Sequence, residues 1–372
     1  MDTQLIATPH ELHTLCAELR AEPWIALDTE FMRERTYYAK LCLIQIATPR
    51  VIVCVDPLAL PDLDPLLDLL YDPRVLKVLH SARQDLEVFF DLRGAVPAPV
   101  FDTQIAAAFL GFDDQVGYAA LVEAITGVKL AKAHTRANWA TRPLLAEYLH
   151  YAEDDVRYLR DVYLHLQGRL VETGRQAWLA DEFTHITDPA LYRNEPSQAW
   201  RRIKHGHQLA PAAQNILQAL SAWRERVAQT QDLPRSWVLR DPVMFDIARV
   251  RPQTREQLAA IRDLDEKTAK KWSGDILEIV STHNTPPAQT LWTPPVPMTP
   301  VQTQMCQQMA VLLDATARQN QLSPAAVATR RDLQHLVMGH SNVPLLQGWR
   351  YELLGRQLVD LLHSQAPPAT GT

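Results

Sequence analysis

Hydrophobic and polar positions repeat with two different periods along the first 170 residues. Short apolar runs typical of strands are QLIA, WIALDTEF, LCLIQIAT, VIVCVDP, VLKVLH and VFD. Amphipathic stretches with helical periodicity are ELHTLCAELR, LDPLLDLLYD, SARQDLEVFFDL and TQIAAAFLGF. Three adjacent strands, followed by strands that alternate with helices, predict an α/β domain with a mixed sheet flanked by helices.

Residues with capping preferences predict where several helices begin. Thr8, Pro9 and Glu11 form a capping box with proline at the first helical position. Ser81 is a candidate cap for the helix after VLKVLH. Pro143 is predicted to start a long helical stretch that ends near Gly174.

Strand patterns fade from about residue 200, and short helical segments follow. The stretch 285–300, TPPAQTLWTPPVPMTP, contains six prolines and predicts a semi-rigid extended linker whose flexibility limited proteolysis would test. QMCQQMAVLLDATARQN and WRYELLGRQLVDLLH bracket a second helical unit. The predicted domains are an α/β domain with a connecting helix at 1–200, a helical domain at 201–285, a proline-rich linker at 286–300 and a second helical domain at 301–372.

Charge is distributed unevenly between these segments. Residues 1–200 contain 29 acidic and 18 basic side chains, whereas residues 201–285 contain 10 acidic and 14 basic ones. The acidic front part argues against passive nucleic-acid binding through a basic patch and suits a site where carboxylates hold cations. Phosphate contacts are expected in the basic middle part.

Cysteine spacing and the N-terminal segment restrict the cellular setting. Four scattered cysteines form neither a disulfide framework nor a zinc-binding spacing, so we expect them reduced and buried (Cys16, Cys42, Cys54 and Cys306). The chain begins without a signal-peptide pattern, and no apolar run approaches the roughly 18 residues of a membrane span. We therefore expect a cytoplasmic protein without membrane contact.

Carboxylates recur at three places where they could share one site. Asp28 and Glu30 are two apart on a strand and so lie on the same face, where their repulsion is costly unless a cation neutralises it. Asp85 falls in the first turn of a helix and could alone be a helix-dipole carboxylate. Tyr151 and Asp155 are four apart on one helical face, a spacing that is also common for surface contacts.

Taken together, these segments resemble the DEDD-type 3′-5′ exonucleases and, within them, the ribonuclease D family. LDTEF, RERTYYAKLCLIQIAT, HSARQDLEVF and WATRPLLAEYLHYAEDDVRYL occur in family order and at family spacing. The resemblance implies an RNase H-like fold with catalytic, metal-binding carboxylates Asp28, Glu30, Asp85 and Asp155. His150 competes with Tyr151 for one catalytic position, but YAxxDVxYL favours the tyrosine subfamily, so His150 is assigned to surface or packing and Asp154 to a solvated neighbour.

The donor set and the resemblance predict the cofactor and the chemistry. Carboxylate oxygens suit Mg²⁺ or Mn²⁺ rather than Zn²⁺. The resemblance to the family implies two ions, about 3.5 to 4 Å apart, that bind the scissile phosphate between them. It also implies nucleoside 5′-monophosphates as the products. Tyr151 would orient the attacking water, since an ordinary phenol with a pKa near 10 stays protonated.

Two further features point to RNA. Arg33, Arg35, Tyr37, Tyr38 and Lys40 mix cationic and aromatic groups as a single-strand contact does, although a solvated hairpin loop would show the same pattern. Residues 209–283 resemble an HRDC domain, and residues 301–365 resemble a second one more weakly. The resemblance implies that both helical modules grip structured RNA.

The expected substrates are RNA 3′ ends, with transfer RNA precursors and other small stable RNAs suggested by the family, and no protein partner is predicted. Two alternatives stay open. A DNA exonuclease of the same superfamily would show the same carboxylates, but HRDC-like modules without a polymerase or helicase motor favour RNA. A catalytically inactive RNA-binding scaffold is disfavoured because all four acids and Tyr151 are present.

Overall fold

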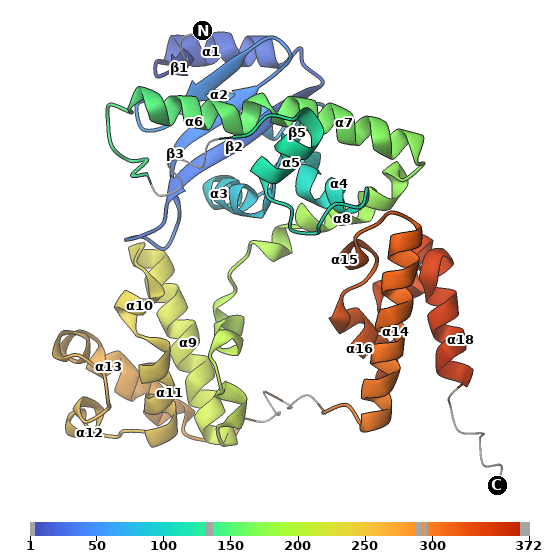
Figure 1. Cartoon of the computed structure of the whole chain (residues 1–372). Helices are drawn as coiled ribbons and strands as arrows, with labels where there is room; N and C mark the ends of the chain where they lie inside the picture. Colours follow the sequence, from blue (N-terminus) through green and yellow to red (C-terminus); the bar gives the residue numbers. More distant parts are fainter. Residues whose placement is uncertain (1–3, 131–136, 288–291, 293–295, 365–372) are drawn as a thin grey trace. The chain divides into compact units, whose positions relative to one another are not determined.

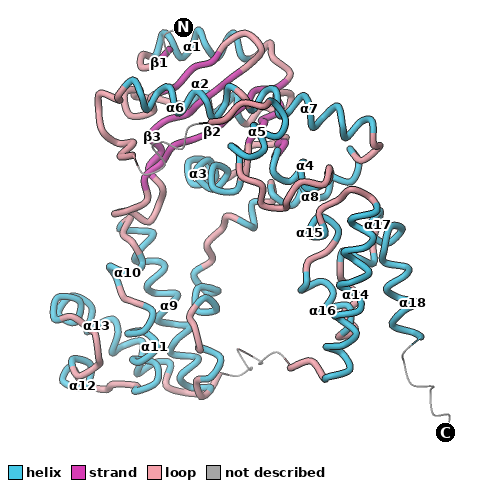
Figure 2. The backbone as a smooth tube through the Cα atoms, in the orientation of Figure 1, coloured by secondary structure: helices cyan, strands magenta, loops and turns pink. Residues whose placement is uncertain are grey.

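The computed structural model describes residues 4–130, 137–287, 292 and 296–364. Contacts divide the chain into two compact units. Figure 1 colours the chain along the sequence, and Figure 2 colours it by secondary structure. The first unit comprises Met1–Phe31, Leu41–Leu191 and Pro297–Thr372. The second comprises Met32–Lys40 and Tyr192–Val296, so a short segment between two strands belongs with the middle of the chain.

A six-stranded mixed sheet is the framework of the first unit. Its strands are β1 Gln4–Ile6, β2 Trp24–Met32, β3 Lys40–Ala47, β4 Ile52–Val55, β5 Leu76–Leu79 and β6 Val100–Asp102. They are ordered β1-β4-β3-β2-β5-β6, with β3 and β4 antiparallel and the pairs β1–β4, β2–β5 and β5–β6 parallel. The predicted mixed sheet is therefore confirmed.

Helices cover this sheet because its central strands are apolar on both faces. In β2, Ile25, Ala26 and Leu27 are at most 1% exposed. The helices before residue 192 are α1 Pro9–Leu19, α2 Asp64–Leu70, α3 Arg83–Arg93, α4 Thr103–Ala108, α5 Tyr118–Thr126, α6 Ala146–Arg157, α7 Leu159–Glu172 and α8 Ala180–Ile186. Buried side chains of α6 and α7 join Ala26 and Val78 of the sheet in one core.

The helices after the proline-rich stretch share that core. They are α14 Pro300–Gln319, α15 Pro324–Val327, α16 Arg330–Val337, α17 Gly348–Arg350, a π-helical turn Tyr351–Gly355 and α18 Arg356–Ser364. Trp349 stacks on Trp178 with ring centroids 4.4 Å apart, and Arg350 pairs with Glu182 at 2.5 Å. Aromatic stacking and a partly buried ion pair thus attach the helices after residue 300 to residues 178–182 within the first unit.

The second unit is helical apart from its hairpin segment. Its helices are α9 Pro211–Gln231, α10 Arg235–Val238, α11 Asp241–Val250, α12 Arg255–Ala259 and α13 Glu266–His283, preceded by the 3₁₀ turns Pro196–Arg202 and Gly206–Gln208. A further 3₁₀ turn, Pro189–Leu191, ends the preceding segment of the first unit. Its core is apolar and centred on Trp200, Leu217 and Leu220. Of the predicted linker, 288–291 and 293–295 lie outside the described residues, while Trp292 packs against Trp200 with centroids 5.2 Å apart.

The structure confirms some of the predicted local features and contradicts others. The capping box at Thr8 is present, and the four cysteines are buried and free. Ser81 was expected to cap α3, which is wrong: the N-cap is Ala82, and Ser81 has a left-handed φ of 58°. Its backbone N–H instead donates to the carboxylate of Asp102 at 3.1 Å, a contact from a distant strand end.

The predicted helix start at Pro143 is also wrong. The helix α6 begins at Ala146, after an extended N-cap residue, Leu145. Arg142 explains the delay, because its guanidinium donates to Asp56 and to the backbone of Cys42 and so holds the preceding turn in a non-helical path. Across the described ranges, no helix combines the length and the apolar character that crossing a bilayer requires.

A buried lysine gives a first prediction, for stability. Lys77 on β5 is fully buried, and its ammonium donates to the carbonyls of Asp72, Val75 and Ala98 at 3.2, 2.7 and 2.8 Å. Lys77→Met removes the ammonium from these three carbonyls, and of the three the carbonyl of Asp72 still accepts from the backbone N–H of Val75 at 3.2 Å. We therefore expect the free energy of unfolding to fall by about 2 kcal/mol in chemical denaturation. Lys129→Met, at an 81% exposed side chain, is the control and should change little. Equal midpoints for both variants would contradict this prediction.

Candidate active site

Strand β2 and helix α6 bring three carboxylates together. Asp28 and Glu30 lie two apart on β2, and Asp155 lies in the last turns of α6. Ligand oxygens of the three side chains lie within 4.8 Å of one another. The strand period of two places Asp28 and Glu30 on one face of β2. The packing of the fold then brings Asp155 of α6 close to both side chains.

Asp85, the fourth predicted carboxylate, lies on the first turn of α3 and is 7% exposed. It accepts a hydrogen bond of 2.5 Å from the hydroxyl of Thr29, the residue between Asp28 and Glu30. Asp102 orients the start of α3 by accepting from the backbone of Ser81 and Ala82 at 3.1 and 2.8 Å. Asp85 is not part of the three-carboxylate cluster found among the described residues, but its negative charge acts on that cluster.

The carboxylates disfavour one another's ionisation. Burial, followed by the charges of Asp85, Asp155 and Glu30, raises the pKa of Asp28 well above its ordinary value. Burial and then the charges of Asp155 and Asp85 raise the pKa of Glu30 to about 8. Burial is the main cause that raises the pKa of both Asp85 and Asp155 to about 7. A cation bound among them would relieve this repulsion.

The donor chemistry fits a hard divalent cation. Every member of the cluster offers a carboxylate oxygen, and neither a cysteine nor a histidine belongs to it in the described part of the chain. Oxygen donors of this kind favour Mg²⁺, Mn²⁺ or Ca²⁺ over softer metals. The residues present therefore fit a divalent metal site.

An ion pair between Arg142 and Asp56 holds the turn that precedes α6. The guanidinium of Arg142 binds both carboxylate oxygens of Asp56 at 2.6 and 2.7 Å and donates to the carbonyl of Cys42 at 2.7 Å. The Asp56 side chain is 3% exposed. Because Asp56 follows β4 and Cys42 lies in β3, this contact fixes the residues before α6 against the sheet.

The residues around Asp155 differ in their surroundings. Tyr151 is partly buried, with its ring 6.3 Å from that of Trp139, and burial and the charge of Asp155 raise the pKa of its phenol. His150 has a 62% exposed side chain and lies 3.9 Å from Glu153. Asp154 pairs with Arg157 at 3.2 Å. On α6, Tyr151 rather than His150 thus has the more enclosed position beside the carboxylates.

Sequence reasoning missed two residues near the carboxylates. Tyr118, the first residue of α5, donates from its hydroxyl to the carbonyl of Asp154 at 2.9 Å, and the charges of Asp155 and Asp28 help to raise its phenol pKa. Thr29 binds Asp85, as described above. Tyr118 lies outside every quoted motif, so only the fold reveals it, whereas the position of Thr29 inside LDTEF could have suggested its role.

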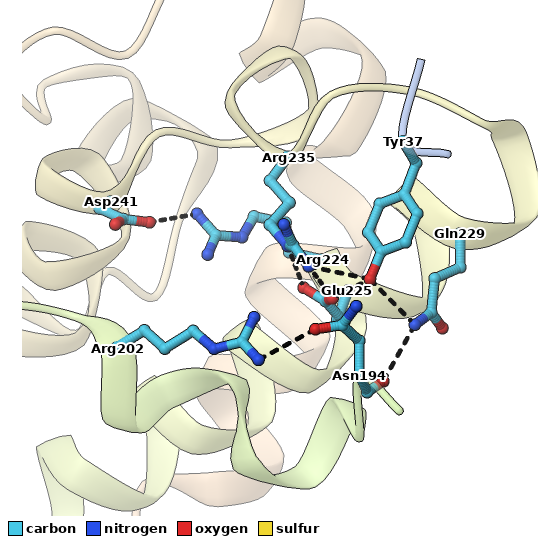
Figure 3. A network of polar contacts seen from close by, with 8 residues as sticks. All are labelled: Tyr37, Asn194, Arg202, Arg224, Glu225, Gln229, Arg235 and Asp241. Carbon is cyan, nitrogen blue, oxygen red and sulfur yellow. Dashed lines mark hydrogen bonds and ion pairs between the residues drawn. The ribbon is translucent and has the colours of Figure 1, made fainter. Parts of the chain in front are cut away.

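The five predicted RNA-contact residues lie between the end of β2 and Lys40, the first residue of β3, in the second unit. Arg33, Arg35 and Lys40 are exposed, and Tyr38 is 38% exposed. Tyr37 is partly buried, and its hydroxyl is the centre of a polar network (Figure 3). The carboxylates, by contrast, belong to the first unit.

The Tyr37 network ties this segment to α9 and α10. Its hydroxyl donates to Glu225 and accepts from Arg235 and Gln229 at 2.9 and 3.2 Å (Figure 3). Arg235 also lies over the Tyr37 ring, 4.6 Å from its centroid. The carboxylate of Asp232 accepts from the Tyr37 backbone at 2.9 Å. The segment is therefore anchored by several bonds within the second unit.

Comparisons with known proteins agree with this arrangement. A family model described as a 3′-5′ exonuclease matches residues 3–171, and an HRDC domain model matches residues 213–280. Ribonuclease D of Acidiphilium cryptum is 39% identical over 96% of this chain and 92% of its own, and that of Gluconacetobacter diazotrophicus is 40% identical over 97% and 93%. The crystal structure of Escherichia coli RNase D is 33% identical, covers 99% of this chain and 100% of its own, and superposes with a TM-score of 0.87. With the carboxylates and the sheet in place, this chain belongs to the ribonuclease D family of 3′-5′ exoribonucleases.

Proposed function

We propose that the chain trims the 3′ ends of transfer RNA precursors and other small stable RNAs by hydrolysis that needs two Mg²⁺ or Mn²⁺ ions and releases nucleoside 5′-monophosphates. The observation that carries the proposal is the cluster of Asp28, Glu30 and Asp155 within 4.8 Å, with Asp85 buried beside it. The structural relative from Escherichia coli is described as an exoribonuclease involved in structured RNA processing. Divalent-metal use follows from the DEDD-type exonuclease fold.

In this proposal Asp28, Glu30, Asp85 and Asp155 would hold the cations, and Thr29 keeps Asp85 in place through its hydroxyl. Bound divalent cations supply positive charge that activates water and stabilises the departing 3′ oxygen. Tyr151 keeps its proton, because burial and the charge of Asp155 raise its pKa, so its hydroxyl acts as a hydrogen-bond donor or acceptor for water rather than as a base. Arg142 holds the turn before α6 and thereby positions Tyr151 and Asp155.

Tyr151→Phe gives a second prediction. The substitution removes only the hydroxyl, so we expect kcat to fall by roughly 10- to 100-fold while KM for RNA stays within a few-fold. Steady-state kinetics on a single-stranded RNA would measure both constants. Tyr148→Phe, on the same helix, is the matched control. A Tyr151→Phe enzyme with unchanged kcat would remove Tyr151 from the catalytic set.

Matched oligonucleotides test the proposed substrate class. The chain is incubated with a transfer RNA carrying a short 3′ extension, with an unstructured RNA of the same length and with a DNA of the same sequence. The proposal expects shortening of the extended transfer RNA toward its mature end and slower loss of DNA. Faster digestion of DNA would replace RNA by DNA as the substrate, and an untrimmed transfer RNA beside a digested unstructured RNA would remove the precursor assignment.

A further inference from the structure

A cavity in the second unit is lined by arginines from separate parts of the chain. It has a volume of about 560 Å³, and Arg33, Arg202, Arg224, Arg235 and Arg240 line it. Arg33 comes from the segment after β2, Arg202 ends a 3₁₀ helix, and the others lie on or beside α9, α10 and α11. We propose that this cavity binds a phosphate group of the RNA backbone. The inference rests on the proposed function, because it takes RNA as the ligand.

Charge in the cavity is unbalanced. Among the described residues, two carboxylates, Glu225 and Asp241, also line the cavity. The five arginines therefore exceed the carboxylates by three formal positive charges. Both carboxylates are already engaged: Arg235 binds Glu225 through two bonds of 2.7 Å, and Arg224 binds Asp241 at 2.5 Å. The remaining positive charge therefore favours an anion.

Arg202 and Arg240 carry much of this excess. Arg202 donates to the side-chain oxygen of Asn194 at 2.9 Å, and Arg240 donates to the backbone carbonyl of Asp263 at 2.5 Å. Both acceptors are neutral, so these bonds orient the guanidinium groups without forming ion pairs. The nearby charges of Glu225 and Asp265 act on Arg202 and Arg240 from a distance. Figure 3 shows Arg202 and Arg224 on one side of Glu225, from different elements of the unit.

The wall of the cavity contains an unsatisfied buried donor. Arg224 is 5% exposed, and its Nε has no hydrogen-bond partner among the described residues. Buried side-chain donors are nearly always satisfied in folded proteins. The Nε is enclosed by protein atoms, so it is an unsatisfied donor in the wall of the cavity rather than a direct ligand contact.

Phosphate matches this donor set better than a carboxylate ligand of similar charge. Planar guanidinium groups arriving from several directions suit the tetrahedral oxygens of a phosphodiester, which can accept bonds from more than one arginine. RNA presents such a group at every nucleotide, and phosphate contacts dominate its affinity for proteins. The segment that contributes Arg33 also directly continues β2, the strand of Asp28 and Glu30.

A pair of arginine variants tests the proposal in the full chain. Arg202 and Arg240 are exposed and hold neither cavity carboxylate, so Arg202→Gln/Arg240→Gln should fold normally, which thermal unfolding checks. Binding of a labelled single-stranded RNA is measured by fluorescence anisotropy in EDTA at several salt concentrations. We expect Kd to rise about tenfold and the slope of log K against log salt to fall by about 1.4, since each contact to a single strand contributes about 0.7.

A control variant separates the cavity from general charge. Arg255→Gln/Arg262→Gln removes the same charge from exposed positions of the same unit, outside the lining residues. We expect it to keep the salt slope of the unmodified chain and to weaken binding much less. Equal losses of affinity and equal slopes for the two double variants would overturn the proposal.

Two further readouts identify the source of the phosphate and isolate the proposed function. If Arg202→Gln/Arg240→Gln loses affinity for inorganic phosphate or a nucleoside 5′-monophosphate but not for RNA, the cavity is a small-anion site and the RNA proposal is overturned. Release of mononucleotides by the unmodified chain is assayed separately. Arginine-dependent RNA binding without such release would support the cavity proposal while the proposed nuclease function fails.

Discussion

Asp28→Asn is expected to reduce exonuclease activity by at least about 1,000-fold without weakening the fold. The amide keeps the shape of the side chain but removes one negative charge from a cluster whose oxygens lie within 4.8 Å of one another. A 1,000-fold loss corresponds to about 4 kcal/mol of transition-state stabilisation, a reasonable size for one ligand of a catalytic metal site. Initial rates on single-stranded RNA with Mg²⁺ and with Mn²⁺ would measure it.

The stability of the same variant provides a second readout. In EDTA, Asp28→Asn should unfold at the same temperature as the unmodified chain or a higher one, because carboxylate repulsion is reduced. Adding Mg²⁺ or Mn²⁺ should raise the midpoint of the unmodified chain by mass action and raise that of the variant less. Asp154→Asn is the control, since Asp154 pairs with Arg157 and lies outside the three-carboxylate cluster. Similar activity losses at both positions would contradict a specific role for Asp28.

Arg142→Ala is expected to cause the largest loss of stability. Removing the guanidinium leaves the 3% exposed Asp56 carboxylate without its ionic partner and deprives the carbonyl of Cys42 of a donor. Breaking one side of a buried ion pair costs about 3 to 5 kcal/mol, and because Arg142 is 27% exposed the lower end is expected. Activity should also fall, since the turn before α6 is released. Chemical denaturation followed by circular dichroism measures the stability loss.

A double-mutant cycle assigns that loss to the pair. Asp56→Ala and the Arg142→Ala/Asp56→Ala double variant are measured together with Arg142→Ala, and the double variant should be less unstable than the sum of the two single ones. Arg169→Ala removes an exposed partner of Glu172 and should change stability by no more than about 0.5 kcal/mol. If Arg142→Ala behaved like Arg169→Ala, the ion pair would not hold the turn.

Local sequence patterns were sufficient for most strands and helices of the sheet-bearing unit. The period of two in WIALDTEF places Asp28 and Glu30 on one face. Each of the six strands corresponds to one of the apolar runs identified in the sequence. The resemblance, rather than periodicity, connected these acids with Asp85 and Asp155. Proximity within 4.8 Å then came from the fold, for Asp28, Glu30 and Asp155.

Features set by distant contacts escaped the local patterns. Ser81 looks like a cap, but Asp102, 21 residues later, takes its backbone donor. Pro143 looks like a helix start, but Arg142 is held by Asp56 and delays the helix to Ala146. In each case a partner far along the chain outweighed the local preference.

Domain membership shows the same limit on a larger scale. The helices after residue 300 share an apolar core with the sheet, and the segment 32–40 belongs with α9 and α10 through Tyr37. Neither association has a local signal, because the partners are separated by more than 100 residues. Domain boundaries drawn along the sequence therefore remain a proposal, apart from the matched exonuclease and HRDC regions.

Product analysis of a single-stranded RNA labelled at its 5′ end tests the central claim most directly. The unmodified chain and Asp28→Asn are incubated with the RNA and Mg²⁺ or Mn²⁺, and the products are separated by length. The account predicts a ladder that shortens one nucleotide at a time from the 3′ end with the unmodified chain and intact RNA with the variant. Intact RNA in both samples, despite measurable binding, would contradict it and favour an RNA-binding scaffold.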